Sequence, residues 1–340
     1  MKRALVTGGA GYIGSHAAKA FAVHGYEPVV LDDLSMGHRW AIRWGPLVQG
    51  DISDAELVRR TVARYKISAA IHFAATAYVG ESMGAPGKYF HNNVANSIAM
   101  LNALIGSGVR QVVFSSTCAT YGVPRCVPLD EDHPQSPINP YGESKLFIER
   151  ALAWYGKAHG LRSVVLRYFN AAGADRDCEI GEDHNPETHL IPLAVFAAQG
   201  SYPPLRIFGV DYDTPDGTAI RDYVHVSDLA EAHVGALQYL ERGGESTAIN
   251  LGMGRGRSVR EIQRAVEKVA GRSVPVIVCS RREGDPPILV ASAEKARKLL
   301  NWSPRSLDIE EIIETAWRWH TRAPRRLAAG ASGGMRQTAL

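Results

Sequence analysis

The sequence has few cysteines, no long apolar run and almost no excess of charge of either sign. Its four cysteines are far apart in the 340 residues and form no CxxC pair, a pattern that predicts neither a disulfide framework nor a metal site. No stretch reaches the roughly 18 uninterrupted apolar residues of a membrane span, and the chain begins with a strand pattern instead of a charged-then-apolar leader. We therefore expect a cytoplasmic protein with reduced thiols and no bound metal.

Charge excludes a further group of functions, because the formal net charge is only +3. The last twenty residues contain no acid and carry four arginines, Arg322, Arg325, Arg326 and Arg336. The rest of the chain is therefore close to neutral. Binding to nucleic acid or to an anionic membrane surface requires a clustered basic face, and no segment of the body supplies one. We expect neither partner.

The first half of the chain alternates short apolar runs with amphipathic stretches. The expected strands are Arg3–Thr7, Pro28–Leu31, Leu47–Gly50, Ala69–Phe73, Val112–Ser115 and Val164–Arg167, and the expected helices are Tyr12–His24, Asp54–Tyr65, Asn92–Ser107 and Tyr141–His159. Such alternation is typical of βαβ units, whose right-handed crossovers place helices on both faces of a parallel sheet. We predict an α/β protein with a doubly wound parallel sheet (Rossmann-type) and a smaller C-terminal α/β domain.

The domain boundaries are expected where this alternation ends. The length favours about two domains, and after about Asn170 the chain becomes rich in polar residues, proline and glycine. We expect a nucleotide-binding domain over residues 1–170 and a substrate domain over 171–320, from which some elements return to the first. Residues 321–340 have too few apolar side chains to pack against the core, so we expect a disordered C-terminal tail. Ser258 predicts a helix N-cap, because Glu261 lies three residues further on.

A glycine-rich segment, GGAGYIG at residues 8–14, joins the first expected strand to the first helix. Gly8 would allow a tight turn, Gly11 would let backbone N–H groups reach a pyrophosphate, and Gly14 would let the helix lie close to the sheet. Asp32 ends the next strand, where a carboxylate accepts hydrogen bonds from an adenosine ribose and repels a 2′-phosphate. The motif therefore predicts NAD and disfavours NADP.

The ends of two later strands extend this prediction. Asp51 and Ile52 would place a carboxylate and an apolar edge near the adenine, although Asp51 could equally cap the next helix. Phe73, Ala74 and Ala75 end the fourth strand mainly with small residues, as expected where a cofactor crosses the sheet edge.

Three further residues predict a catalytic group. Tyr141 and Lys145 lie four residues apart at the start of an expected helix, so they share one face. A lysine cation, together with a positive nicotinamide ring, would lower the pKa of the phenol from about 10 toward neutrality and make it a general base. Thr117 would place a hydroxyl at the carboxyl edge of the sheet, within reach of the substrate oxygen. Without this context, a YxxxK pair is more often a solvated helix edge.

Several motifs, in the right order, resemble the extended short-chain dehydrogenase/reductase family over about residues 2–320. They are the glycine loop, Ser115-Ser116-Thr117, Tyr141-Gly142-Glu143-Ser144-Lys145, Leu166-Arg167-Tyr168-Phe169-Asn170 and Arg221-Asp222-Tyr223-Val224-His225-Val226. Within that family, the segments Val79-Gly80-Glu81-Ser82, Ile207-Phe208-Gly209-Val210-Asp211-Tyr212 and Arg281-Arg282-Glu283-Gly284-Asp285 are similar to the UDP-glucose 4-epimerases. The resemblance implies that UDP-glucose and UDP-galactose are interconverted by NAD-mediated oxidation at C4, rotation of the 4-keto sugar and re-reduction on the opposite face.

The resemblance also implies roles for individual residues. Tyr141 would be the base at the sugar 4-hydroxyl, Lys145 would hold the nicotinamide ribose, and Thr117 would keep a hydroxyl that many relatives have as serine. The implied cofactor-binding residues are Gly8, Gly11, Tyr12, Ile13, Gly14, Asp32, Asp51, Ile52, Phe73, Ala74, Ala75, Asn92, Ser115, Tyr141, Lys145 and Phe169, although Asn92 could equally be a helix cap. The implied substrate-binding residues are Thr117, Tyr141, Asn170, His189, Leu190, Phe208, Arg221, Arg282, Asp285 and Leu289.

A sugar that rotates must be held by its nucleotide, so most of the binding energy should come from the UDP part. Arg221 and Arg282 match phosphate-contacting arginines of the family; the alternative for each is an ordinary surface ion pair. Some relatives have an asparagine pair where this chain has Thr188-His189-Leu190, and His189 could still donate to a phosphate. Others have a lysine where this chain has Ala77, which puts affinity in doubt. Leu289 stands where some relatives have a bulky tyrosine against the sugar 2-position. Because leucine is shorter, we expect room there for an N-acetyl group.

Other functions stay open at this point. SSTCATYG at residues 115–122 also resembles epimerases of UDP-arabinose and UDP-xylose, and a broad-range epimerase that includes UDP-GlcNAc is a further alternative. A 4,6-dehydratase would need an acid pair beside Thr117, which the sequence lacks. A catalytically silent NAD-binding regulator would be expected to have lost Tyr141 or Lys145.

The resemblance further implies a homodimer, in which two helices of each subunit form a four-helix contact. The helices expected at 92–107 and 141–159 are the candidates, although their apolar residues could all face the core instead.

Overall fold

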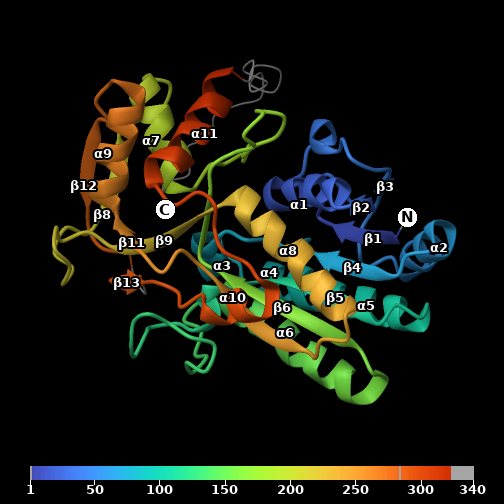
Figure 1. Cartoon of the computed structure of the whole chain (residues 1–340). Helices are drawn as coiled ribbons and strands as arrows, with labels where there is room; N and C mark the ends of the chain where they lie inside the picture. The colour runs from blue at the N-terminus through green and yellow to red at the C-terminus, as the bar shows by residue number, and fades with distance from the viewer. Residues whose placement is uncertain (1, 283–284, 323–340) are drawn as a thin grey trace.

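The computed structural model describes residues 2–282 and 285–322. Its centre is a seven-stranded sheet in the order β10-β6-β5-β4-β1-β2-β3 (Figure 1), and every neighbouring pair is parallel. The strands are β1 (Lys2–Thr7), β2 (Tyr26–Asp32), β3 (Leu47–Gln49), β4 (Ala69–His72), β5 (Gln111–Thr117), β6 (Arg162–Tyr168) and β10 (Thr247–Leu251). The predicted fold class, a doubly wound parallel sheet, is confirmed.

Helices cover both faces of this sheet. They are α1 (Tyr12–Val23), α2 (Ala55–Tyr65), α5 (Asn96–Gly106), α6 (Pro140–His159), α8 (Val226–Glu241) and α10 (Glu294–Leu300). One apolar core lies between the sheet and α1, α8 and α10, and includes Phe21 and Leu237. The other core lies against α2, α5 and α6, and includes Leu104 and Ile148. Strand residues alternate between the two cores, as the period of a strand buried on both faces requires.

The remaining elements form smaller sheets and a helical layer. One sheet contains β7 (Asn170–Ala172), β9 (Ile220–His225), β11 (Gly256–Ser258) and β13 (Ile288–Leu289), and a second pairs β8 (Leu205–Phe208) with β12 (Val276–Cys279). The helices α7 (Leu190–Gln199), α9 (Val259–Ala270) and α11 (Ile309–Arg322) pack together around a third core, at the upper left of Figure 1. Short elements complete the described chain: η1 (Arg39–Ala41), α3 (Val79–Gly84), α4 (Pro86–Tyr89), η2 (Phe90–Ala95) and η3 (Cys118–Thr120).

Local signals explain where several helices begin and end. Ser258 caps α9 in a capping box with Glu261, as predicted. Asn139 caps α6 by accepting a hydrogen bond from the Gly142 N–H. Gly160 then ends α6 in the left-handed region, which glycine adopts without strain.

The structure differs from the sequence prediction in two places. The helix expected at 92–107 begins with a wide π-helical turn, η2, before α5, and Asn92 lies inside this turn instead of capping a helix. The expected tail at 321–340 overlaps α11, which continues to Arg322; residues 323–340 lie outside the described residues. The predicted domain boundaries stay a prediction. Within the described chain, no helix combines the length and apolar character needed to span a bilayer.

Candidate active site

The glycine loop connects β1 to α1 at the carboxyl edge of the sheet. Gly8 has a φ of +70°, and a Cβ there would lie 2.6 Å from the Ala74 backbone nitrogen, so a side chain would force the loop off β4. A Cβ on Gly14 would lie 2.2 Å from the Gly8 carbonyl oxygen, so only glycine lets α1 start this close to the sheet. Gly11 precedes α1 and offers no side-chain cap. The first N–H groups of α1 therefore remain available to an anion.

Asp32 lies beside this loop at the end of β2. Its Oδ2 accepts a hydrogen bond from the Ala10 N–H at 2.9 Å, and its Oδ1 accepts one from the Leu34 N–H at 2.9 Å. Burial raises the pKa of this carboxyl, while the two backbone N–H groups lower it. Each oxygen keeps a lone pair that a ribose hydroxyl can use.

The ends of β3 and β4 continue the same edge. The Asp51 carboxylate accepts a hydrogen bond from the Ser53 N–H at 2.7 Å, whereas the cap of α2 is Asp54. Asp51 is therefore not the cap of this helix. Ile52 is buried in the core beneath α2. Phe73 follows β4 and lies against the His233 ring, with 4.6 Å between ring centroids.

Three side chains of the predicted catalytic group lie at the ends of β5 and α6. Thr117 ends β5, and Tyr141 lies in the first turn of α6 with its hydroxyl hydrogen-bonded to the Thr117 side chain. Lys145 is almost fully buried, donates to the Ser115 carbonyl oxygen at 2.8 Å and lies with its Nζ 6.0 Å from the centroid of the Tyr141 ring. The structure thus brings the predicted tyrosine, lysine and threonine together.

The pKa of the tyrosine in the free chain is set by burial. Burial raises the pKa of Tyr141 to about 12, and the hydrogen bond with Thr117 opposes the shift. Burial also lowers the pKa of Lys145, to about 7, with Glu149 acting in the opposite direction. Only part of the lysine population is therefore charged at neutral pH. The predicted activation of the tyrosine includes the positive nicotinamide ring, so it concerns the NAD-bound protein and stays a prediction.

A buried network behind this group escaped the sequence reasoning. Arg167, next to the end of β6, pairs with Glu149 of α6 at 2.6 Å, and both side chains are 7% exposed. The same carboxylate accepts a hydrogen bond from the Ser116 hydroxyl, beside Thr117. The available signal was the four-residue spacing from Lys145 to Glu149, which puts both on one helix face.

Two consecutive asparagines tie the loop after β4 to α6. Asn92 donates to the Thr76 hydroxyl at 3.0 Å. Asn93 donates to the Thr76 carbonyl oxygen and to the Ser144 hydroxyl, each at 3.0 Å. The predicted Asn92 therefore lies at the sheet edge, while the buried contact to the catalytic helix belongs to Asn93, which the sequence analysis did not select.

The predicted substrate residues gather around β9 and β13. Register pairs Leu289 with Arg221 and Asn170 with Tyr223, and Arg221 forms an ion pair with Asp285. Leu289 packs against the small apolar cluster that contains Cys118 and Phe169. The positive charge of Arg221 also acts on the pKa of Cys118, the residue after Thr117. Leu289 and Arg221 therefore lie near Cys118, the residue that follows Thr117.

A second pair of predicted residues lies at the end of β8. The guanidinium of Arg282 lies over the Phe208 ring, 3.9 Å from its centroid, and Arg206 lies 5.3 Å from the same ring. A planar ring with two guanidinium groups beside it can bind a flat heterocycle next to a phosphate.

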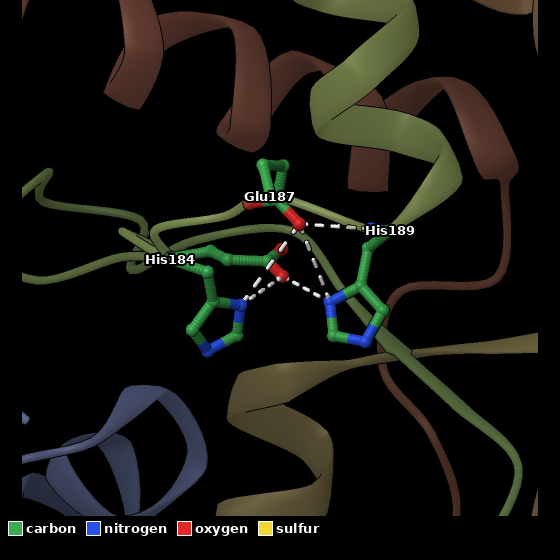
Figure 2. Close-up of side chains that lie close together, drawn as sticks. His184, Glu187 and His189 are labelled. Atoms are coloured by element: carbon green, nitrogen blue, oxygen red, sulfur yellow. Dashed lines mark hydrogen bonds and ion pairs between the residues drawn. The ribbon is translucent and has the colours of Figure 1, made fainter. Parts of the chain in front are cut away.

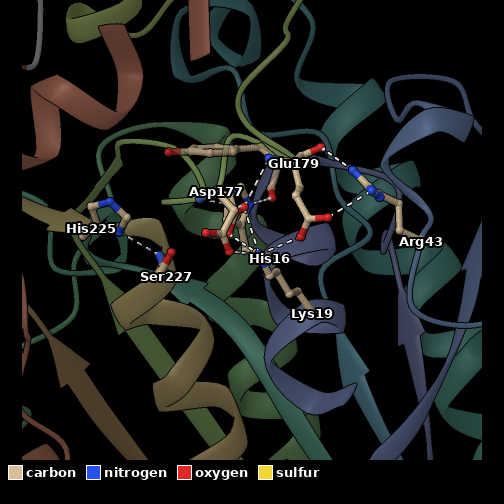
Figure 3. A network of polar contacts seen from close by, with 9 residues as sticks. His16, Lys19, Arg43, Asp177, Glu179, His225 and Ser227 are labelled. Carbon is tan, nitrogen blue, oxygen red and sulfur yellow. Dashed lines mark hydrogen bonds and ion pairs between the residues drawn. The ribbon is translucent and has the colours of Figure 1, made fainter. Parts of the chain in front are cut away.

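The long loop between β7 and α7 runs past the start of α1. Tyr12 donates to the Gly173 carbonyl oxygen at 2.6 Å. Figure 3 shows Lys19 of α1 among three loop carboxylates, with its Nζ 2.8 Å from Asp175, 3.1 Å from Asp177 and 2.9 Å from Glu179. The loop is therefore anchored to the first helix by a partly buried ionic contact.

The end of this loop contains His189, whose Nδ1 faces two carboxylates. Its Nδ1 contacts Glu182 and lies 3.8 Å from Glu187, as Figure 2 shows. Burial alone would lower its pKa, but the Glu182 carboxylate raises the pKa of His189 to about 9. Leu190, the next residue, begins α7. Only Nε2 of the imidazole remains free to face a ligand.

The fold and the site define the short-chain dehydrogenase/reductase class. A glycine loop lies at the start of α1, a tyrosine–lysine pair lies beside Thr117, and both are at one edge of a doubly wound sheet. Residues 4–252 match the family described as the NAD dependent epimerase/dehydratase family, and the chain belongs to it. The resemblance found in the sequence is therefore confirmed.

Individual relatives match over nearly the full length. A UDP-glucose 4-epimerase of Rhizobium meliloti is 54% identical over 318 residues, which cover 94% of this chain and 97% of that protein. The crystal structure of UDP-glucose 4-epimerase from Brucella ovis in complex with NAD is 52% identical, covers 93% of this chain and 98% of its own, and superposes with a TM-score of 0.91. The UDP-Glc/GlcNAc 4-epimerase of Campylobacter jejuni is 42% identical, with 95% and 100% covered and a TM-score of 0.83.

Proposed function

We propose that this chain is a UDP-glucose 4-epimerase, which interconverts UDP-glucose and UDP-galactose with NAD as its cofactor. The observation that carries the proposal is the convergence of Thr117, Tyr141 and Lys145 at the sheet edge that also holds the glycine loop. The family and the names of the near-full-length relatives support the same reaction.

The residues at the sheet edge fit NAD. Gly8 and Gly14 leave no room for side chains where the loop approaches β4 and α1, and the uncapped start of α1 suits a pyrophosphate. Asp32 would hold the adenosine ribose, and Lys145 the nicotinamide ribose. When bound, NAD supplies the hydride acceptor at sugar C4, a positive ring charge, and the hydride for re-reduction of the 4-keto sugar on its opposite face.

Tyr141 would accept the proton of the sugar 4-hydroxyl, and Thr117 would orient Tyr141. In the free chain, burial keeps the proton on Tyr141, so ionisation depends on positive charge brought beside the ring. The ionised phenol then takes the proton from the sugar hydroxyl and returns it to the inverted hydroxyl. Thr117 shares a hydrogen bond with the phenol throughout and orients it toward the sugar.

The nucleotide would be held by residues that do not touch the reacting carbon. Arg221 and Arg282 can bind the diphosphate, and the Phe208 ring can lie beside the uracil. If only the UDP part is bound tightly, the 4-keto sugar can rotate in the site, and inversion of the configuration at C4 requires this rotation. The substrate role of residues 171–320 belongs to this proposal.

The test compares two phenylalanine variants of one helix. Tyr141→Phe removes the proposed base, while Tyr155→Phe, also on α6, removes an exposed hydroxyl that donates to Asn102 of α5. We expect Tyr141→Phe to retain NAD and to lose at least about 100-fold in turnover of UDP-galactose, and Tyr155→Phe to behave as the wild type. Equal turnover in all three proteins would refute the role of Tyr141.

The proposal extends to a homodimer. The apolar residues of α5 face the core, but α6 leaves Phe147 50% and Trp154 67% exposed. These residues lie seven apart and so share one helix face. A second copy of the same helix would cover them across a two-fold axis.

A cytoplasmic location completes the proposal. It is supported by the four cysteines, all within the described chain and all free thiols, as expected in a reducing compartment.

A further inference from the structure

Four metal-ligating side chains lie within eight residues at the end of the loop before α7. They follow the pattern E-x-H-x-x-E-x-H: Glu182, His184, Glu187 and His189. One ligand atom of each lies within 4.8 Å of the others. Figure 2 shows both imidazoles with their Nδ1 atoms turned toward the carboxylates. Neither the glycine loop nor the catalytic group uses this cluster.

The spacing of the four ligand atoms suits tetrahedral coordination. Bonds of about 2.0–2.2 Å from zinc to nitrogen or oxygen place neighbouring ligand atoms about 3.4 Å apart. His184 Nδ1 lies 3.1 Å from Glu182 and 3.9 Å from Glu187. His189 Nδ1 lies 3.8 Å from Glu187 and closer still to Glu182. Small side-chain shifts would therefore complete a tetrahedron around one ion.

No lysine or arginine of the described residues pairs with the carboxylates of this cluster. The side chains of Glu182 and Glu187 are 3% and 4% exposed, and their only ion pairs among the described residues are with imidazoles. The other acidic group of the same loop differs in this respect, because Lys19 lies among its carboxylates (Figure 3). Two carboxylates buried this closely together are costly when only imidazoles pair with them, and a divalent ion would neutralise both.

We propose that Glu182, His184, Glu187 and His189 bind one transition-metal ion of the Zn²⁺ class. Two imidazoles with two carboxylates suit such an ion better than Ca²⁺ or Mg²⁺, which prefer all-oxygen sites. The ion would fix the loop onto the start of α7. Coordination through Nδ1 would also place the proton of His189 on Nε2, so the free edge of this ring becomes a constant hydrogen-bond donor. The site does not depend on the proposed epimerase reaction.

The test measures metal binding by the full-length, untagged protein. The protein is stripped with a chelator, titrated with Zn²⁺ against a chromophoric competitor and analysed for metal content. We expect one equivalent of Zn²⁺ and a higher melting temperature. The double variant His184→Gln/Glu187→Gln should bind at least about ten-fold more weakly. The control Asp177→Asn alters the acidic group that already contains a lysine and should bind as the wild type.

Loading with Co²⁺ identifies the ligands. Tetrahedral nitrogen and oxygen coordination gives visible d–d bands without thiolate charge-transfer bands, and the double variant should lose them. The proposal is overturned if the stripped wild type takes up no stoichiometric Zn²⁺, if charge-transfer bands place the ion on cysteines, or if the double variant binds as tightly as the wild type. The wild-type result stands even if the double variant fails to fold.

Discussion

Removal of the Arg167 cation should destabilise the chain far more than removal of a comparable surface cation. Arg167 and Glu149 pair at 2.6 Å with both side chains 7% exposed, so Arg167→Met leaves a buried carboxylate without a counter-charge. Breaking such a pair costs about 3–5 kcal/mol. The matched control is Arg59→Met, which removes an ion pair with Glu56 whose side chains are 50% and 59% exposed and should cost about 0–1 kcal/mol.

Urea unfolding and thermal melting measure both variants. An unfolding entropy of about 2.1 cal/mol/K per residue over about 320 residues gives about 0.7 kcal/mol/K, so Arg167→Met should lower the melting temperature by roughly 4–7 °C. Adding Glu149→Gln to Arg167→Met should recover part of the loss, because the carboxylate that lost its arginine partner is then removed as well. A cost below about 1 kcal/mol for Arg167→Met, equal to that of the control, would refute the reasoning.

Four further predictions concern cofactor, pH, sugar range and assembly. Gly14→Ala places a Cβ 2.2 Å from a carbonyl oxygen and should lower the NAD content of the purified protein at least about ten-fold, whereas Gly84→Ala, whose Cβ meets nothing within 4 Å, should keep it. Burial lowers the pKa of His233 to about 4. As pH falls, the unfolded chain therefore takes up a proton on this residue before the folded chain does. The free energy of unfolding should decrease between about pH 6.5 and pH 4, by up to about 1.4 kcal/mol per pH unit for this residue. Urea unfolding of His233→Gln across this window should show a shallower slope, and an unchanged slope would contradict the assignment. Leu289→Tyr should reduce turnover of UDP-GlcNAc relative to UDP-glucose; equal, negligible rates in both proteins would remove the idea of a wider pocket. Trp154→Glu should convert the dimer to a monomer in light scattering, and a wild type that is itself monomeric would disprove the dimer.

The central sheet could be predicted from sequence because its strands carry their own signal. Runs such as Ala4–Thr7 and Val112–Ser115 are apolar on both faces, as strands buried between two helical layers must be. The strands of the later half could not be found this way. Strands such as β13, with two residues, are held by pairing with distant segments, and no local pattern marks them.

The same contrast applies to the site. The glycine loop and the Tyr141–Lys145 spacing are local motifs, so the sequence alone could select these residues, and the fold brings Tyr141, Lys145 and Thr117 together. The pKa of Tyr141 could not be predicted, because it depends on burial by residues distant in the chain. His189 was assessed alone, whereas its partner Glu182 lies on the same loop and was visible in the sequence.

The most direct test of the proposed function is NMR of the purified protein incubated with UDP-galactose and no added NAD. The proposal predicts that the anomeric signal of UDP-glucose grows to equilibrium, with the cofactor retained from expression. No conversion, either without NAD or after NAD is added, would contradict it.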